Sequence, residues 1–323
     1  MKSHRASVLF FLIFLSYSTL AQEKKTFLYA EKDTTKLYMD VYYPEKQNDK
    51  QSCVFFIFGG GYIIGARDDQ QIQSIKKHFT DEGYIVIGID YRLGLKNVTN
   101  FSIITGFKNY ERAVIMATED FISALSFTLK NINEGAKFPI NPKNIIAMGS
   151  SAGAITALQT DYAICNGFYN SDILPDSFRL AGVISYSGAI FSTHGSPKYK
   201  KHEPAPTLFC HGMKDELVVY NKIQIFNLGL FGSDHLVRKF KKNNYGYHIR
   251  RYPVIGHQVA ILYPNELHKI DEFIENIIFG NKKIQIDETY YDPSIKPIFL
   301  NFKIKDLETV KGIETIDEFE TIK

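Results

Sequence analysis

Residues 144–153 read NIIAMGSSAG and place two adjacent serines among small residues. The five residues 149–153 fit the pattern G-x-S-x-G with Ser151 at the centre, after a short apolar run and before the helix-like stretch AITALQTDYA. A nucleophilic serine on a sharp turn from strand to helix needs neighbours without bulk two positions away on either side. We therefore predict that Ser151, and not Ser150, is a nucleophile. The alternative is a helix cap without chemistry.

A serine that transfers acyl groups needs hydrogen-bond donors for the oxyanion, and FIFGGGYIIG at 56–65 supplies a candidate loop. Its three consecutive glycines let backbone N–H groups approach a ligand without a Cβ in the way. We predict that the donors are the N–H groups of Gly60, Gly61 and Ala152. A phosphate loop is excluded because Ile64 occupies the third glycine position of G-x-G-x-x-G and no G-x-x-x-x-G-K-[ST] is present. The remaining alternative is a tight loop without function.

The base and the acid of such a site should follow the serine on loops past strand ends. His257, in VIGHQVA, comes after the last predicted core strand and before the last predicted helix. Asp215, in TLFCHGMKDELV, lies five residues past the end of a predicted buried strand. We predict His257 as the base and Asp215 as the acid. Glu216 and Asp234 are weaker candidates for the acid, and His211 is expected to shape the loop.

The chain alternates strand-like and helix-like segments. Continuous apolar runs are typical of strands buried on both faces of a parallel sheet, and they lie at 53–58, 84–90, 144–149, 180–187 and 206–210. A half-buried antiparallel strand is predicted at 36–44, another strand at 247–253, and helices at 68–81, 107–132, 151–162, 219–230 and 258–278. This order predicts one α/β domain with a mostly parallel, doubly wound sheet and helices on both faces. The polar segment 188–204 is expected to be a loop.

The N-terminus has the layout of a secretory signal peptide. Lys2 and Arg5 precede an apolar run at 8–15, and small or polar residues follow up to Ala21. The apolar run is shorter than the roughly 20 residues that a membrane span needs, although a signal anchor is the alternative. We expect residues 1–21 to be removed and the chain to be exported to the periplasm or outside the cell. Residues 22–278 are the predicted catalytic domain, and 279–323 an extension of unknown role.

Composition and charge narrow the partners. The chain has 323 residues, 45% of them hydrophobic, and 38 basic against 35 acidic side chains. Loss of Lys2 and Arg5 with the signal peptide leaves the charge almost balanced, so neither nucleic acid nor stable insertion in a membrane is expected. The three cysteines, Cys53, Cys165 and Cys210, have no regular spacing and are predicted to be core residues rather than a disulfide framework. No motif for a metal site or a cofactor is present.

Together these motifs resemble the α/β-hydrolase superfamily, and within it the carboxylesterases and lipases that carry an HGGG oxyanion motif. The fragments GGGYIIGARD, IDYRLGL (89–95) and HGMKDELV carry the resemblance, which covers about residues 36–278. Phe58 stands where the family often has a histidine that braces the oxyanion loop. Phenylalanine cannot do this by hydrogen bonding, so Asp90 or Arg92 is expected to hold the loop.

The resemblance implies a serine carboxylesterase that works through an acyl-enzyme and needs no cofactor. Its substrate would be a small or carbohydrate-linked ester with a short acyl group, for example an acetyl or feruloyl ester. One alternative is a peptidase of the prolyl oligopeptidase type, against which stands the absence of a propeller-sized N-terminal domain. Another is a hydrolase fold that only binds. Retention of Ser151, Asp215 and His257 argues against that reading.

Overall fold

The computed structural model describes residues 23–98, 103–132, 138–280 and 283–298. The predicted signal peptide therefore lies outside the described residues, as do residues 299–323. Within the described part, no helix is long and apolar enough to cross a membrane.

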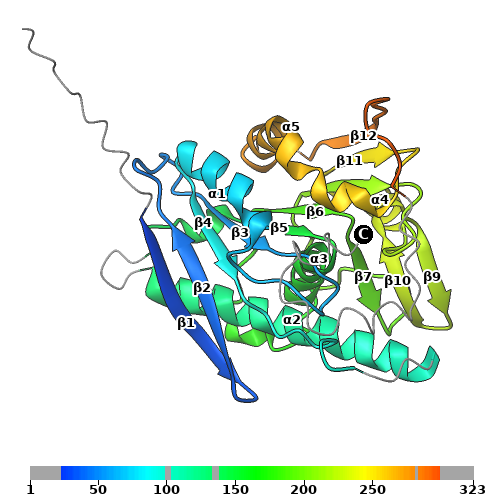
Figure 1. Cartoon of the computed structure of the whole chain (residues 1–323), viewed down its shortest axis with the longest axis horizontal. Helices are drawn as coiled ribbons and strands as arrows, with labels where there is room; N and C mark the ends of the chain where they lie inside the picture. Colours follow the sequence, from blue (N-terminus) through cyan, green and yellow to red (C-terminus); the bar gives the residue numbers. More distant parts are fainter. Residues whose placement is uncertain (1–22, 99–102, 133–137, 281–282, 299–323) are drawn as a thin grey trace, which may run out of the picture.

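Nine strands of the described residues form one central sheet in the order β1-β2-β4-β3-β5-β6-β8-β11-β12 (Figure 1). β1, β2 and β4 pair antiparallel, and all pairs from β4 to β12 are parallel. The strands are β1 (Lys24–Lys32), β2 (Thr35–Tyr42), β3 (Cys53–Ile57), β4 (Ile85–Ile89), β5 (Ile145–Ser150), β6 (Gly182–Tyr186), β8 (Thr207–Gly212), β11 (Tyr247–Tyr252) and β12 (Gln285–Thr289).

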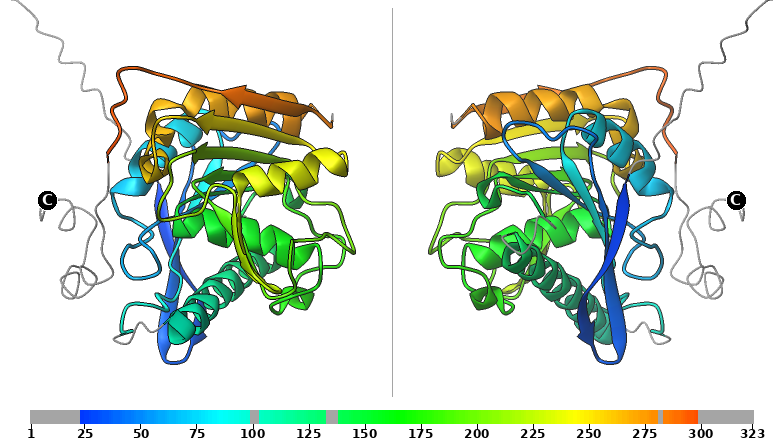
Figure 2. Two further views of the ribbon diagram at one scale, coloured as in Figure 1. Left: turned by 90° about the vertical axis from the view of Figure 1, so that its right-hand side faces the viewer. Right: turned by 90° about the vertical axis from the view of Figure 1, so that its left-hand side faces the viewer.

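Helices cover both faces of this sheet (Figure 2). α1 (Gln70–Asp81) and α5 (Leu267–Phe273) share one face, where His78 Nε2 lies 2.8 Å from Asp271 Oδ1. α2 (Ile103–Asn131) and α3 (Ala152–Ile164) pack together on the other face. α4 (Ser233–Lys242) packs against β8 and β11. The mostly parallel, doubly wound arrangement agrees with the fold class that the sequence predicts.

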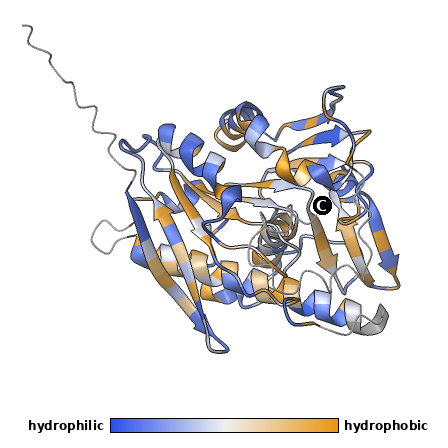
Figure 3. Ribbon diagram, in the orientation of Figure 1, coloured by the Kyte–Doolittle hydropathy of each residue, from blue (hydrophilic) through white to orange (hydrophobic). Residues whose placement is uncertain are grey.

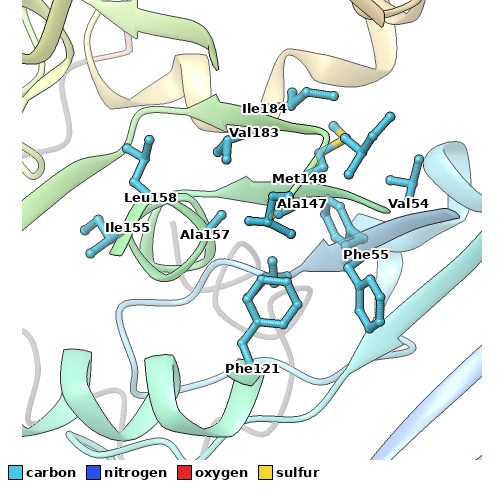
Figure 4. Packing of buried hydrophobic residues seen from close by; sticks show 14 of the residues in the cluster. Val54, Phe55, Phe121, Ala147, Met148, Ile155, Ala157, Leu158, Val183 and Ile184 are labelled. Carbon is cyan, nitrogen blue, oxygen red and sulfur yellow. The ribbon is translucent and has the colours of Figure 1, made fainter. Parts of the chain in front are cut away.

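The core lies where the apolar runs of the sequence meet the two helices α2 and α3. Every residue of β3, β5 and β6 is buried, as expected for strands covered on both faces. Figure 4 shows Phe121 of α2 and Ala157 of α3 against these strands, and the rings of Phe121 and Phe55 lie 5.4 Å apart. α3 is buried all round, whereas α2 alternates hydrophobic and hydrophilic residues (Figure 3). α3 is therefore a central helix, and its first residue follows Ser151.

The predicted helix at 219–230 is wrong. Residues of this segment form a hairpin of β9 (Lys222–Ile225) and β10 (Leu228–Gly232), and β10 also pairs with β7 (Ala189–Ser192) in a separate three-stranded sheet. Ile223 and Ile225 alternate with polar residues, which is the period of a strand. Phe226 adopts a φ of +52° in the two-residue turn. β7 also lies inside the segment 188–204, which was expected to be a loop.

The predicted helix at 258–278 is broken into several turns. It consists of η3 (His257–Ile261), η4 (Tyr263–Asn265), the short helix α5 and the π-helical turn η5 (Ile274–Ile278). Pro264 lacks the N–H of a helix interior and clashes with the preceding turn, so a continuous helix cannot pass through it.

Both edges of the sheet differ from the sequence-based description. β1 pairs with β2 at one edge, although no strand was predicted there. β2 was predicted as a half-buried strand. Asp40, on the face opposite Leu37 and Met39, is nevertheless buried and pairs with Lys24 and Arg67. At the other edge β12 pairs in parallel with β11. Part of the predicted extension 279–323 is therefore the last strand of the sheet.

Candidate active site

Ser151 lies on a strained turn between β5 and α3. Its backbone has a φ of +50° and a ψ of −119°, a region that costs a non-glycine residue about 1–3 kcal/mol. A Cβ on Gly149 would lie 2.3 Å from the backbone of Gly153, and a Cβ on Gly153 would lie 2.0 Å from the carbonyl oxygen of Ile57. The turn is thus possible only with glycines at both positions. The N–H of Ser151 donates to the carbonyl of Tyr186 at 2.9 Å, which fixes the turn to β6.

The neighbouring Ser150 has a different environment. Its side chain is buried, and its Oγ donates to the carbonyl of Ala260 at 2.7 Å. Ala260 lies in η3, the turn that begins at His257. Ser150 therefore ties the strand before the nucleophile turn to the segment that carries the histidine, and its hydroxyl does not face the site.

His257 and Ser151 are in hydrogen-bond contact. Ser151 Oγ lies 2.8 Å from His257 Nε2. The other ring nitrogen, Nδ1, lies 2.9 Å from Asp215 Oδ2 and 3.1 Å from Oδ1. Because the carboxylate only accepts, the proton belongs on Nδ1, and Nε2 is then the acceptor for the Ser151 hydroxyl. The structure brings the three residues that the sequence selected into one hydrogen-bonded row.

Asp215 is held in place by its own loop. Its Oδ1 accepts hydrogen bonds from the N–H groups of Leu217 at 3.0 Å and Val218 at 2.8 Å. Burial raises the pKa of Asp215, but hydrogen bonds and charge from His211 and His257 outweigh it and hold the pKa well below its ordinary value. The acid is therefore ionised at any pH at which the protein is expected to work.

His211 contacts the acid directly, which the sequence did not reveal. It is fully buried, and its Nε2 lies 3.3 Å from Asp215 Oδ2 and 3.1 Å from the carbonyl of Val218. Its Nδ1 lies 2.7 Å from Ser233 Oγ. The Ser233 hydroxyl can donate to Nδ1, which leaves the Nε2 proton for the two oxygens. The expected loop-shaping role is present, and contact with Asp215 is added to it.

The glycine loop after β3 presents unused donors near the nucleophile turn. Gly60 and Gly61 have φ values of +118° and +64°, and a Cβ on Gly60 would lie 2.1 Å from the carbonyl oxygen of Ile64. Among the described residues, the N–H groups of Gly60, Gly61 and Ala152 have no hydrogen-bond acceptor. The N–H of Gly59, by contrast, donates to Gln71 Oε1 at 2.8 Å. The free donors are those that the sequence selected.

Of the two residues expected to hold this loop, Asp90 does contact it, because Asp90 Oδ2 lies 2.8 Å from Nη1 of Arg67 on the same segment between β3 and α1. Arg92 does not, since it pairs with buried Asp120. Tyr91, which was not predicted, adds a second contact: its hydroxyl donates to the Phe58 carbonyl at 2.9 Å, and the two rings stack with centroids 4.3 Å apart. Gly65 leaves room for the Phe58 ring, since a Cβ there would lie 2.4 Å from it. The stack of Phe58 on Tyr91 thus braces the loop at the position where related proteins often have a histidine.

The weaker candidates for the acid lie elsewhere. Glu216 is exposed, and Asp234 pairs with Arg238 at 3.0 Å. The described residues contain no group of three or more side chains that could hold a metal ion. All three cysteines are buried and free, as the sequence predicts for core residues.

Sheet topology explains why these loops meet. The chain crosses from β3 to β4 on one side and then returns to β5 on the other side of β3. Ligands of open α/β sheets bind outside the carboxyl ends of the strands at such a reversal. The glycine loop follows β3 and Ser151 follows β5, so both border this crevice. Asp215 and His257 follow β8 and β11 at the same edge of the sheet.

Comparisons with solved structures identify the fold. The esterase 2 of Thermogutta terrifontis phosphoramylated by tabun matches with a TM-score of 0.57 and 18% identity, covering 79% of this chain and 94% of that chain. Its propionate-bound structure matches with a TM-score of 0.58 and 20% identity over 79% and 94%. The chain has the α/β-hydrolase fold. At this level of identity the likeness establishes the fold alone.

Sequence comparisons cover parts of this chain. Residues 39–190 match the BD-FAE family model, a stretch with the glycine loop and Ser151 that ends before Asp215. Gut esterase 1 of Caenorhabditis briggsae is 30% identical over 123 residues, 38% of this chain and 20% of that protein. The non-reducing polyketide synthase nvfA of Aspergillus novofumigatus is 29% identical over 138 residues, 42% and 6%. The chain thus spans a fifth or less of these curated relatives, and the overall similarity is to esterase-like hydrolases.

Proposed function

We propose that this α/β-hydrolase is an exported serine carboxylesterase that cleaves carboxylic esters through Ser151, His257 and Asp215. The observation that carries the proposal is the hydrogen-bonded row from Ser151 Oγ to His257 and on to Asp215, at 2.8 Å and 2.9 Å. Three backbone N–H groups without acceptors, on Gly60, Gly61 and Ala152, accompany the row. A nucleophile, a base, an oriented acid and oxyanion donors are the parts that acyl transfer requires.

In the proposed mechanism, His257 Nε2 takes the proton of the Ser151 hydroxyl as Oγ attacks the ester carbonyl. The tetrahedral oxyanion accepts hydrogen bonds from the glycine loop and Ala152, and one such donor is worth about 10²–10³ in rate. The His257 proton then passes to the leaving alcohol, which departs. Water, activated by the same nitrogen, attacks the acyl-enzyme and releases the acid. Asp215 holds the imidazole tautomer throughout.

The proposed substrates are esters with short acyl groups. The related esterase of T. terrifontis was solved with propionate and with butyrate bound, and both acyl groups are short. We extend this to acetyl or feruloyl esters of carbohydrates, a substrate class that rests on the family resemblance of the motifs. Export rests on the signal-peptide layout of residues 1–21.

A fluorophosphonate probe tests the nucleophile. It should label the wild-type protein and not Ser151→Ala, because the probe reacts with an activated serine. Ser150→Ala is the matched control for the neighbouring hydroxyl and should still be labelled. Absence of labelling on wild type would contradict the enzyme proposal, and labelling of Ser151→Ala would contradict the assignment of the nucleophile.

Hydrolysis of p-nitrophenyl acetate should fall by about 10⁴-fold or more in Ser151→Ala, since residues of a triad act as a unit. Acetylated and feruloylated xylan fragments, measured in parallel with Xaa-Pro peptides, test the substrate class. Turnover of the peptides without turnover of esters would replace the esterase proposal by the peptidase alternative.

A further inference from the structure

A shallow apolar depression lies beside the histidine. His257 lines it together with Leu217, Val254 and Ile298, and the polar residues Lys214 and Glu216 also border it. The aliphatic side chains are 45%, 40% and 51% exposed. Exposing these three aliphatic side chains to water costs free energy. A concave apolar site of this kind next to a base is typical of a surface that covers a ligand.

One wall of the depression comes from the far end of the described chain. After β12 the chain runs down the side of the molecule on which the loop after β3 lies (Figure 2). Gln258, the neighbour of His257, holds it there: its amide Nε2 donates to the carbonyl of Lys296 at 2.8 Å, and its Oε1 accepts the N–H of Ile298 at 2.5 Å. Both polar groups of one side chain therefore fix Ile298 relative to the histidine.

The position of the depression assigns it to one half of an ester. The acyl half must lie between Ser151 and the donors of the glycine loop, whereas the leaving oxygen must lie next to His257 Nε2, which protonates it. The depression is bordered by the acid loop, the histidine loop and the segment at 296–298. Neither Ser151 nor the glycine loop lines it. Its lining thus includes the histidine that would protonate a leaving alcohol and none of the residues proposed to hold the acyl half.

We propose that this depression binds the apolar face of a ring in the leaving alcohol, and that Ile298 determines which alcohols are accepted. The proposal rests on the esterase function proposed above and adds the alcohol side of its specificity. The chemistry shared by possible ligands is a flat ring with an apolar face, which both an aryl alcohol and a pyranose sugar present. Contacts of this kind change kcat/KM through the free energy of binding the transition state.

Full-length Ile298→Ala and wild type are compared on esters that differ only in the alcohol: methyl acetate, 2-naphthyl acetate and methyl O-acetyl-xylopyranoside. The ratio of kcat/KM for the ester of a ring alcohol to kcat/KM for methyl acetate should fall about tenfold in the variant. The ring ester with the larger fall identifies whether aryl or sugar faces are preferred. Gln258→Ala, which releases the wall, should lower the same ratio.

Ile223→Ala is the matched control, because Ile223 is similarly exposed (57%) but lies on β9 in the separate sheet. It should leave all ratios unchanged. A second series of p-nitrophenyl acetate, propionate and butyrate varies only the acyl group, and its ratios should not change in Ile298→Ala. Equal loss on methyl and ring acetates, or a change confined to the acyl series, would overturn the proposal. If wild type neither hydrolyses esters nor takes the fluorophosphonate label, the esterase function itself fails.

Discussion

At Ser151 and Ser150 two identical side chains, one peptide apart, have unrelated roles. Ser150 is the last residue of β5, and its hydroxyl donates to the carbonyl of Ala260. Ser151 has a positive φ in the turn after β5, and its hydroxyl contacts His257 instead. The difference arises from the backbone conformation and from the room left by the flanking glycines. We infer that the buried serine supports the histidine segment and the strained one faces substrate.

His211 should matter for the rate although it cannot reach substrate. His211→Leu removes the donor at Asp215 Oδ2, and a hydrogen bond to a charged group is worth about 1.5–3 kcal/mol. The pKa of Asp215 would rise, its orientation would loosen, and kcat for p-nitrophenyl acetate should fall about 10–100-fold with little change in KM.

His211→Gln is the control for this prediction, because the glutamine Nε2 lies the same number of bonds from the backbone and can donate to the same carboxylate. It should recover most of the lost kcat. If His211→Gln is as slow as His211→Leu, or if both variants raise KM instead, His211 only packs the loop and does not position the acid.

The residues that sequence could select are those whose chemical type is fixed by a local pattern. Ser151 is centred in G-x-S-x-G, and His257 and Asp215 follow predicted strand ends at distances of a few residues. The roles of Tyr91 and His211 could not be predicted because they depend on which side chains meet across the sheet. Tyr91 follows β4 and contacts Phe58 after β3, a pairing that no local period reveals.

At the scale of elements, α3 carries an ionisable group in its interior. Asp161 is buried, and among the described residues its carboxylate accepts the N–H of Ala205, at 3.3 Å, and a long contact from the Cys165 thiol. Burial raises the pKa of Asp161 to about 7 from the ordinary value of 3.8, against the opposing effects of Ala205 and Arg179. The helix that follows the nucleophile therefore holds a carboxyl group that prefers to be neutral.

Asp161→Asn should change how stability depends on pH. Between pH 3.8 and about 7 the folded protein binds more protons at this site than the unfolded chain, so the free energy of unfolding falls as the pH rises through this window and levels off above it. The full effect is at most about 4 kcal/mol. Asparagine keeps an acceptor for Ala205 and does not titrate.

The stability gain of Asp161→Asn over wild type, measured by urea unfolding, should therefore be small near pH 4 and largest at pH 8. Comparison of the two proteins at each pH cancels the contributions of other titrating groups. A gain that is the same at pH 4 and pH 8 would contradict the raised pKa of Asp161.

Helices and strands whose hydrophobic pattern matches their burial were predicted from the sequence. The elements that were not predicted have physical reasons. The apolar runs of β3, β5 and β6 could only be buried strands in this context. The hairpin β9–β10 was missed because its alternation spans only four residues before the turn at Phe226. The helix 258–278 was overextended because its periodicity continues across Pro264, which interrupts the backbone hydrogen bonds.

At the scale of the molecule, the central sheet extends past residue 278, where the predicted domain ends. β12 covers the edge of β11, and Arg251 of β11 pairs with Asp287 of β12 at 2.8 Å. An uncovered parallel edge would expose the backbone donors and acceptors of β11. No periodic signal marked β12, since the side chains of this edge strand are mostly exposed.

The proposed export can be tested on the whole chain. If residues 1–21 are a signal peptide, protein recovered outside the cytoplasm should begin at Gln22. N-terminal sequencing or intact mass measures this, and Val8→Arg together with Leu12→Arg, which interrupts the apolar run, should keep the chain uncleaved inside the cell. Recovery of exported protein that begins at Met1 would favour the signal anchor instead.

The burial of all three thiols has a practical consequence for labelling. Burial raises the pKa of Cys53, Cys165 and Cys210 well above the ordinary value, so little reactive thiolate forms on the folded protein. A cysteine introduced at Phe226, which is 93% exposed at the hairpin tip, would then be the single site for a maleimide dye or spin label. The chain's own cysteines should therefore not react with thiol reagents in the folded protein, and probes can be attached without first removing them.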